Sequence, residues 1–458
     1  MRIIIEGAGE VGSHVAKMLA SQGNDITVID SEPSRLASLK ASTGVLTVPS
    51  SLTCISTLKD CHVEDADLFI AVNPGVPQDV NIVSALLAKN LGCRKVTARI
   101  DDEEFLASEN KLMFKQMGID LLFYPERIAA DEIQMMLRHS SSTDSMEIAR
   151  GKLQLEVFRV DDESVLLDLK VAEFTALIAE KEPDIALRIA AISRGGKTLI
   201  PRFDTRFRWG DLVYIISTRE GIGKITSILK KNRINIRSVM VMGGSSICEM
   251  LVSSLWKTVD SVKIIERNLE RCHMLTEHFD SLGAENVDIV AGDGRDTDFL
   301  LEESIRDYNA FVAVTGNDEA NILACIGAKK FGIRRVIAEV ENIEYLRLAE
   351  EMGVDAVINK KLITASRIFK FTLSDKIRSI KYMSGTNAEV LEYTVAPGSA
   401  ITKGALKDLD FPADSVIGGL IRGGNAYIAV GDTCIEAYDR VVVFALPDAV
   451  RAVDKFFR

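Results

Sequence analysis

A glycine-rich segment behind an apolar strand is the first feature of the sequence that could bind a ligand. Ile3, Ile4 and Ile5 run through Glu6 into the segment Gly7-Ala8-Gly9-Glu10-Val11-Gly12. In a Gly-x-Gly-x-x-Gly segment between a strand and a helix, the first glycine permits a tight turn and the second lets backbone N–H groups approach a pyrophosphate. The third lets the helix pack close to the sheet, and the helix N-terminus adds partial positive charge. The segment therefore predicts a dinucleotide site.

Asp30 supplies the second part of this pattern. It ends a predicted strand over residues 26–29 and follows Gly12 by 18 positions. A carboxylate at that place can accept hydrogen bonds from both ribose hydroxyls, and it repels a 2′-phosphate, so it favours NAD over NADP. The alternative, a dinucleotide fold that keeps its glycines only for packing, is the less favoured interpretation.

The whole pattern recurs in the second half of the chain. Gly243 follows Gly7 by 236 positions, and Glu266 follows Asp30 by the same number. The second loop reads Gly243-Gly244-Ser245-Ser246-Ile247-Cys248, with serine at the second glycine position and cysteine at the third. These side chains hinder close approach of a phosphate, so we expect the first copy to be the main dinucleotide site.

Other parts of the site differ between the two copies. After the third strand, copy two has Gly292-Asp293-Gly294 where copy one has Ser50-Ser51-Leu52. At the end of the fifth strand, copy one has Arg99, a candidate phosphate partner, and copy two has Glu339. Copy one thus keeps the phosphate-binding parts, and copy two keeps an acidic loop.

A small module after each copy is also repeated. Arg194-Gly195-Gly196 and Asp211 in the first module recur 228 positions later as Arg422-Gly423-Gly424 and Asp439. Each Arg-Gly-Gly follows an apolar run and indicates a hairpin turn. We assign no ligand to these modules. The order of the chain is nucleotide-binding domain, small domain, nucleotide-binding domain, small domain.

Composition excludes several classes of protein. The chain has 458 residues, 47% of them hydrophobic, and a net charge of −11, which is opposite to the basic surface of a nucleic-acid-binding protein. No apolar run reaches the ~20 residues that span a membrane. Because residue 2 already begins a predicted strand, we expect no signal peptide. Seven scattered cysteines without a Cys-x-x-Cys pair predict a reduced, cytosolic protein.

The spacing of apolar runs predicts an α/β fold. Strands are expected at residues 3–5, 26–29, 44–48, 68–72, 95–100 and 120–123, with amphipathic segments between them. Alternating strands and helices indicate a doubly wound parallel sheet. We expect two such Rossmann-like domains, each followed by a small α+β regulatory domain, with boundaries at 1–139, 146–232, 233–375 and 376–458.

Catalytic residues are missing from the sequence patterns. The five histidines, at positions 14, 62, 139, 273 and 278, form no metal-binding motif, and neither a Gly-x-Ser-x-Gly motif nor a Walker lysine is present. The small modules, at about 80 residues, are too short for the substrate domain of a dehydrogenase. A nucleotide site without catalytic apparatus indicates a sensor rather than an enzyme.

Two further segments carry a resemblance to a known family. Ala71-Val72 is followed by Gln78-Asp79-Val80-Asn81, and copy two reads Ala313-Val314-Thr315-Gly316-Asn317-Asp318-Glu319-Ala320-Asn321. With the doubled domain order, these segments resemble the TrkA family over essentially the whole chain. Members are cytosolic regulatory subunits of bacterial Trk potassium uptake systems, built from two tandem RCK (regulator of potassium conductance) units.

The resemblance implies ligands, partners and site residues. It implies binding of NAD(H), and of ATP or ADP, assembly as a tetrameric ring, and attachment to a TrkH-type integral membrane subunit on the cytoplasmic face of the bacterial inner membrane. The implied nucleotide-site residues of copy one are Gly7, Ala8, Gly9, Glu10, Val11, Gly12, Asp30, Asn73, Pro74 and Arg99. Those of copy two are Gly243, Gly244, Ser245, Ser246, Ile247 and Glu266. Copy one departs from the family pattern in a longer loop after Asn73 and in Ser50-Ser51.

Two other functions remain open on the sequence alone. A soluble NAD-dependent oxidoreductase would account for the glycine loop and Asp30, but for nothing else in the pattern. A regulator of a different membrane transporter would share every feature described above.

Overall fold

The chain forms two compact units in a computed structural model. Residues 1–21, 23–73, 77–138, 144–148, 151–162, 164–195, 197–229, 236–372, 377–382 and 388–457 are described. The first unit comprises Met1–Ala129 and Lys360–Thr372, and the second comprises Ala130–Asn359 and residues 373–458. Each unit is described below by itself.

The first unit is built on a six-stranded parallel sheet in the order β3-β2-β1-β4-β5-β6. Its strands are β1 (Arg2–Glu6), β2 (Asp25–Asp30), β3 (Leu46–Pro49), β4 (Leu68–Ala71), β5 (Lys95–Arg99) and β6 (Leu121–Phe123). Its helices are α1 (Glu10–Ser21), α2 (Pro33–Thr43), α3 (Ile55–Asp60), α4 (Gln78–Asn90) and α5 (Ser108–Met117). Strand order reverses between β1 and β4, and in doubly wound sheets ligands bind outside the carboxyl ends of the strands at such a point.

A helix from late in the sequence completes this unit. Helix α14 (Lys360–Thr372) packs against α1, the helix that follows the first glycine loop. The Lys95 ammonium lies 5.0 Å from the centre of the Phe371 ring and adds a cation–π contact between the sheet and this helix. A segment that continues from copy two therefore forms part of the domain of copy one.

The second unit contains a matching parallel sheet in the order β14-β13-β12-β15-β16-β17. Its strands are β12 (Ser238–Met242), β13 (Ser261–Glu266), β14 (Val287–Ala291), β15 (Ala310–Ala313), β16 (Arg335–Glu339) and β17 (Ala356–Ile358). Its helices are α9 (Ser246–Leu255), α10 (Leu269–Ser281), α11 (Thr297–Glu302), α12 (Asp318–Lys330) and α13 (Ile343–Glu351). The later part of α6 (Pro125–Arg138) joins this domain, because the Gln134 amide donates to the Ser254 carbonyl at 2.9 Å.

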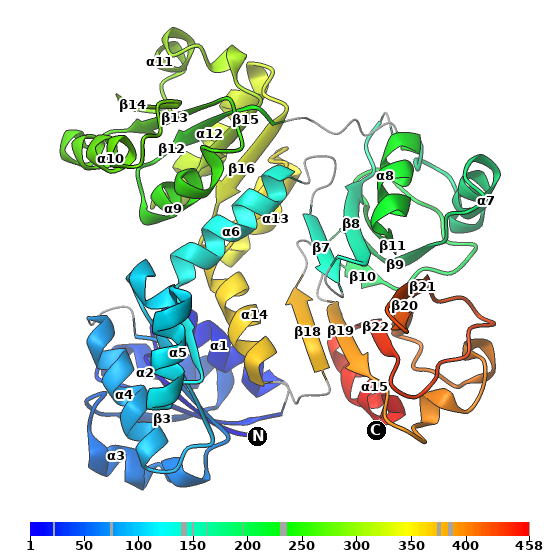
Figure 1. The fold of residues 1–458 in the computed structure, drawn as a ribbon, viewed down its shortest axis with the longest axis horizontal. Helices are drawn as coiled ribbons and strands as arrows, with labels where there is room; N and C mark the ends of the chain where they lie inside the picture. The colour runs from blue at the N-terminus through cyan, green and yellow to red at the C-terminus, as the bar shows by residue number, and fades with distance from the viewer. Residues whose placement is uncertain are drawn as a thin grey trace. The chain divides into compact units, whose positions relative to one another are not determined.

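Two antiparallel sheets, whose strands are labelled in Figure 1, share one strand order, and both belong to the second unit. The first contains β7 (Asp144–Ile148), β8 (Leu153–Arg159), β9 (Leu187–Arg194), β10 (Lys197–Leu199) and β11 (Leu212–Thr218), with α7 (Val171–Lys181) and α8 (Arg219–Ile228). The second contains β18 (Ile377–Tyr382), β19 (Glu389–Thr394), β20 (Ser415–Arg422), β21 (Asn425–Ile428) and β22 (Arg440–Ala445), with α15 (Val450–Phe457). One buried cluster joins them, with Leu155 and Tyr214 of the first sheet and Val442 and Phe444 of the second.

The repeated Arg-Gly-Gly segments have a structural role beyond the turn. Strands β20 and β21 pair antiparallel around Gly423 and Gly424. The φ values of these two residues, 55° and 85°, lie in the left-handed region that favours glycine. Arg194 makes a two-pronged ion pair with Asp211, and Arg422 makes the same pair with Asp439. The residues that recur 228 positions apart therefore form the same contact in each small domain, a buried aspartate bound to an arginine.

The expected fold class is confirmed. Both parallel sheets and both small antiparallel sheets are present in the expected order along the chain. The second small domain differs from the first in one respect: where the first has α7, the second has the short 3-10 turns Ala400–Thr402 and Leu406–Asp408.

Candidate nucleotide sites

Each glycine loop lies at the carboxyl end of the central strand of its sheet. Gly7 and Gly243 have φ values of 105° and 103°, and their N–H groups donate to the Ile29 and Ile265 carbonyls, both at 2.8 Å. A Cβ on Gly12 would lie 1.9 Å from the Gly7 carbonyl oxygen, so only glycine fits that place as the backbone stands. The φ value of the first glycine fits the predicted tight turn, and the space at the third glycine fits the predicted close packing of the helix.

The acid at the end of the second strand holds each glycine loop in place. Asp30 accepts hydrogen bonds from the Ala8 N–H at 2.5 Å and the Glu32 N–H at 2.7 Å. Glu266 accepts in the same way from the Gly244 N–H at 2.6 Å and the Asn268 N–H at 2.7 Å. A shaping role for the acid was not foreseen from the sequence. Each carboxylate oxygen keeps a second lone pair for the predicted ribose contact, but Glu266 is half-buried whereas Asp30 is fully buried.

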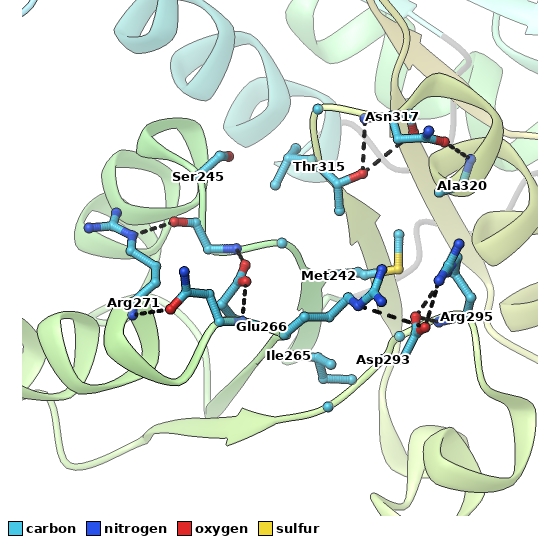
Figure 2. A pocket seen from close by; sticks show the side chains of 18 residues that line it. Met242, Ser245, Ile265, Glu266, Arg271, Asp293, Arg295, Thr315, Asn317 and Ala320 are labelled. Atoms are coloured by element: carbon cyan, nitrogen blue, oxygen red, sulfur yellow. Dashed lines mark hydrogen bonds and ion pairs between the residues drawn. The ribbon is translucent and has the colours of Figure 1, made fainter.

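A pocket of about 540 Å³ adjoins the second loop (Figure 2). That volume is within the range of small-molecule sites. The lining comes from the glycine loop, the ends of β12 and β13, residues 292–295, the loop after β15, and two helix residues, Arg271 of α10 and Ala320 of α12. Among the predicted residues of copy two, Gly243, Gly244, Ser245 and Glu266 line the pocket.

Arginines and acids alternate around this pocket. Arg295 donates to both oxygens of Asp293, at 3.0 and 2.7 Å, and this hydrogen bonding lowers the pKa of Asp293 to about 2. Arg271 donates to the Gly244 carbonyl at 2.6 Å and to Glu249 at 2.5 Å. Guanidinium groups pair readily with phosphate, and the ionised acids can accept from ribose or base. The lining thus suits an anionic nucleotide.

The two substituted glycine positions of copy two are accommodated by the helix. The Ser245 hydroxyl accepts from the Cys248 N–H at 3.4 Å and so caps α9. Cys248 is fully buried, and burial raises the pKa of its thiol, so the side chain is a neutral packing group. Ser246 and Ile247 lie in the first turn of α9. The N–H groups of a first turn have no carbonyl partner within the helix, so they can donate to a bound anion.

A turn after the fourth strand is fixed in the same way in both copies. The Asn81 amide accepts from the Asn73 N–H at 3.1 Å and donates to the Asn73 carbonyl at 3.0 Å. Asn321 makes the same pair of bonds with Thr315, at 3.1 and 3.0 Å. The repeated asparagine therefore shapes this loop. Pro74, also expected at the site, lies outside the described residues.

Arg99 is already paired with carboxylates. Its Nε donates to Asp101 at 3.1 Å, and a terminal nitrogen lies 3.6 Å from Glu126. Lys360 of α14 lies 3.2 Å from the same Glu126 oxygen. A phosphate at Arg99 would have to join or replace these partners, so the predicted phosphate contact remains a prediction.

Two ionisable residues near the first loop were missed by sequence reasoning. Lys361 of α14 lies 2.9 Å from Glu10 in the first turn of α1, and only the tertiary fold brings them together. Glu6 is fully buried directly before Gly7. The sequence signal for Glu6 was an acidic residue directly after the apolar run Ile3-Ile4-Ile5.

Comparison with known domain families settles the relationship. The TrkA-N domain model matches residues 3–125 and 239–360, and the TrkA-C domain model matches residues 155–230 and 390–458. The chain belongs to the TrkA family. The alternating TrkA-N and TrkA-C matches confirm the tandem domain order.

Full-length relatives and solved structures agree with this family. The Trk system potassium uptake protein TrkA homolog of Archaeoglobus fulgidus is 33% identical, with 100% of each chain covered. The TrkA protein of Halomonas elongata is 30% identical over 100% of this chain and 99% of its own. The crystal structure of the GsuK RCK domain aligns with a TM-score of 0.60 at 14% identity, covering 100% of this chain and 94% of that one. The GsuK channel bound to NAD aligns with a TM-score of 0.61 at 15% identity, covering 100% and 78%. At these identities the likeness shows that this chain and GsuK share a fold.

Proposed function

We propose that the chain is a cytosolic nucleotide-sensing regulatory subunit that gates a TrkH-type potassium uptake channel. The observation that carries the proposal is the pair of glycine loops, each at the reversal point of a doubly wound sheet and each fixed by an acid. The names of the TrkA relatives support potassium uptake as the process, and the NAD-bound GsuK channel supports the ligand class.

NAD(H) is the proposed ligand of both loops, with ATP or ADP as further ligands. In copy one the proposed contacts are Gly7, Ala8, Gly9, Glu10, Val11, Gly12, Asp30, Asn73, Pro74 and Arg99. In copy two they are Gly243, Gly244, Ser245, Ser246, Ile247 and Glu266. Asp30 is fully buried and Glu266 is half-buried, so a ribose reaches the acid of copy one only if the loop around it opens.

The proposed role is sensing rather than catalysis. An NAD-dependent oxidoreductase needs a proton donor and a substrate pocket beside the nicotinamide, whereas a sensor only binds and releases. We expect calorimetry on the full chain to show NADH binding, and NADH absorbance to stay constant over hours with candidate alcohols, aldehydes and keto acids. Steady consumption of NADH with any of them would favour the oxidoreductase.

The membrane partner and the assembly complete the proposal. No helix in the described ranges has the length and apolar character to cross a membrane. We propose attachment to a TrkH-type integral subunit on the cytoplasmic face of the bacterial inner membrane, and self-association as a tetrameric ring. Co-purification with the membrane subunit would separate this partner from another transporter, and sedimentation velocity measures the assembly directly. The proposed domain limits are 1–139, 146–232, 233–375 and 376–458.

A further inference from the structure

Glu6 stands in the first copy at the position equivalent to a pocket-lining residue of the second copy. It ends β1 directly before the glycine loop and is fully buried. The residue at the same place in copy two, 236 positions later, is Met242, which lines the described pocket beside the Gly292-Asp293-Gly294 turn. Copy one therefore has a carboxyl group where copy two has a thioether.

The hydrogen bonds around Glu6 favour its protonated form. The Ser84 hydroxyl lies 2.8 Å from Glu6 Oε1 and 3.1 Å from the Leu52 carbonyl oxygen. One hydroxyl proton cannot serve both acceptors fully. If Glu6 carries a proton, Glu6 donates to Ser84 and Ser84 donates to Leu52, and both contacts become complete hydrogen bonds. The same chain of bonds holds the turn after β3.

In the described part of the chain, the Ser84 hydroxyl is the one group that stabilises a charge on Glu6. Its second oxygen, Oε2, is buried and has no hydrogen-bond partner. Among the described residues, Asp30 on β2 acts on Glu6 through its charge, α4 contributes the Ser84 hydroxyl, and the turn after β3 contributes the Leu52 carbonyl that Ser84 also contacts. Burial, and to a lesser degree Asp30, raise the pKa of Glu6 well above its ordinary value, against the opposing effect of the Ser84 bond. Across the described part of the chain, no lysine, arginine or histidine forms an ion pair with Glu6.

We propose that Glu6 makes nucleotide binding at the first site proton-dependent, so that the site binds its nucleotide while Glu6 holds a proton. With the proton present, the carboxylate of Asp30, which the Arg35 guanidinium faces at 3.9 Å, is the one acidic charge at the base of the glycine loop among the described residues, and the loop accepts phosphates. Without it, a second negative charge beside Asp30 repels them. The second site has Met242 and binds independently of pH over the same range. This inference rests on the proposed nucleotide site.

The test is a calorimetric titration of the full chain with NADH from about pH 6 to pH 9, above the ordinary range of a glutamate. Above the pKa of Glu6, wild-type affinity at the first site falls by up to about tenfold per pH unit, because one proton is linked to binding. In Glu6→Gln, which keeps a donor toward Ser84 and cannot ionise, the affinity stays at the low-pH value across the range. Glu109→Gln, which changes an exposed acid of α5, keeps the wild-type pH dependence. A Glu266→Ala background weakens the second site and isolates the first.

The outcomes separate this inference from the proposed function. NADH binding with no pH dependence in the wild type, or equal pH dependence in Glu6→Gln, overturns the inference and leaves the nucleotide site intact. Failure of NADH, ATP and ADP to bind at any pH overturns both. Unfolding gives a second measurement without ligand. Because the folded pKa of Glu6 lies above its unfolded value, wild-type stability relative to Glu6→Gln must fall as pH rises through the folded pKa. A constant difference would show that Glu6 does not hold a proton.

Discussion

Replacing Arg194 with alanine is expected to lower the free energy of unfolding of the first small domain by about 1 to 3 kcal/mol, the usual cost of leaving a buried hydrogen-bonding group without its partner. Arg194 donates from Nε to Asp211 at 2.8 Å and from a terminal nitrogen to the other Asp211 oxygen at 2.7 Å. The same terminal nitrogen donates to the Arg206 carbonyl at 2.7 Å. Asp211 is fully buried, so the substitution leaves a buried carboxyl group without its arginine partner.

Arg208→Ala is the matched control for this prediction. Arg208 is exposed, and it contacts Asp211 through its backbone N–H, which alanine retains. We expect its effect to stay within about 0.5 kcal/mol, as for most surface substitutions. Arg422→Ala should act in the same direction on the second small domain, with a smaller effect because the Arg422 side chain is 35% exposed against 27% for Arg194. Denaturant unfolding followed by circular dichroism measures all three, and equal midpoints for Arg194→Ala and Arg208→Ala would contradict the structural role.

Replacing Asp30 with alanine is expected to weaken NADH binding by about 1.5 to 3 kcal/mol, the usual contribution of hydrogen bonds to a charged group. That loss is roughly 10- to 150-fold in the dissociation constant. The substitution removes the acceptor of the Ala8 and Glu32 N–H groups, which sets the shape of the glycine loop, and it removes the proposed acceptor of the ribose hydroxyls.

Glu266→Ala is the corresponding change in copy two and removes the equivalent contacts to Gly244 and Asn268. If copy one is the main NADH site, Glu266→Ala has the smaller effect. Calorimetry on both variants, with folding checked by their unfolding midpoints, decides between the copies. Unchanged affinity in Asp30→Ala together with loss of binding in Glu266→Ala would move the main site to copy two, where the described pocket lies.

The parts of the site that follow from local sequence were predictable. Gly7 is needed for a turn, and Gly12 is needed because its helix passes close to Gly7. Both requirements arise within a few residues, so the spacing of the two glycines indicates their roles. The parallel strands were recognisable because buried strands of this kind are continuous apolar runs. Asp30 and Glu266 were found because each ends the strand after a glycine loop.

The remaining features depend on contacts between distant segments. The sequence does not show that α14 packs on α1 and brings Lys361 to Glu10, because residues about 350 positions apart meet only in the folded chain. The relay from Glu6 through Ser84 to Leu52 joins three separate segments for the same reason. The hairpin at Arg194 was predicted from its glycines, whereas its pairing with Asp211 depends on β9 and β11 lying side by side.

The central claim is that nucleotide binding to this chain controls a potassium-transporting membrane subunit. A ligand shifts a conformational equilibrium only by its differential affinity for the two states, and coupling between two sites is reciprocal. The most direct measurement is therefore the affinity for NADH, ATP and ADP with and without a reconstituted TrkH-type subunit. The account predicts that at least one of these affinities changes on docking, by about tenfold for a coupling of ~1.4 kcal/mol. Equal affinities in both states, for every nucleotide that binds, would contradict it.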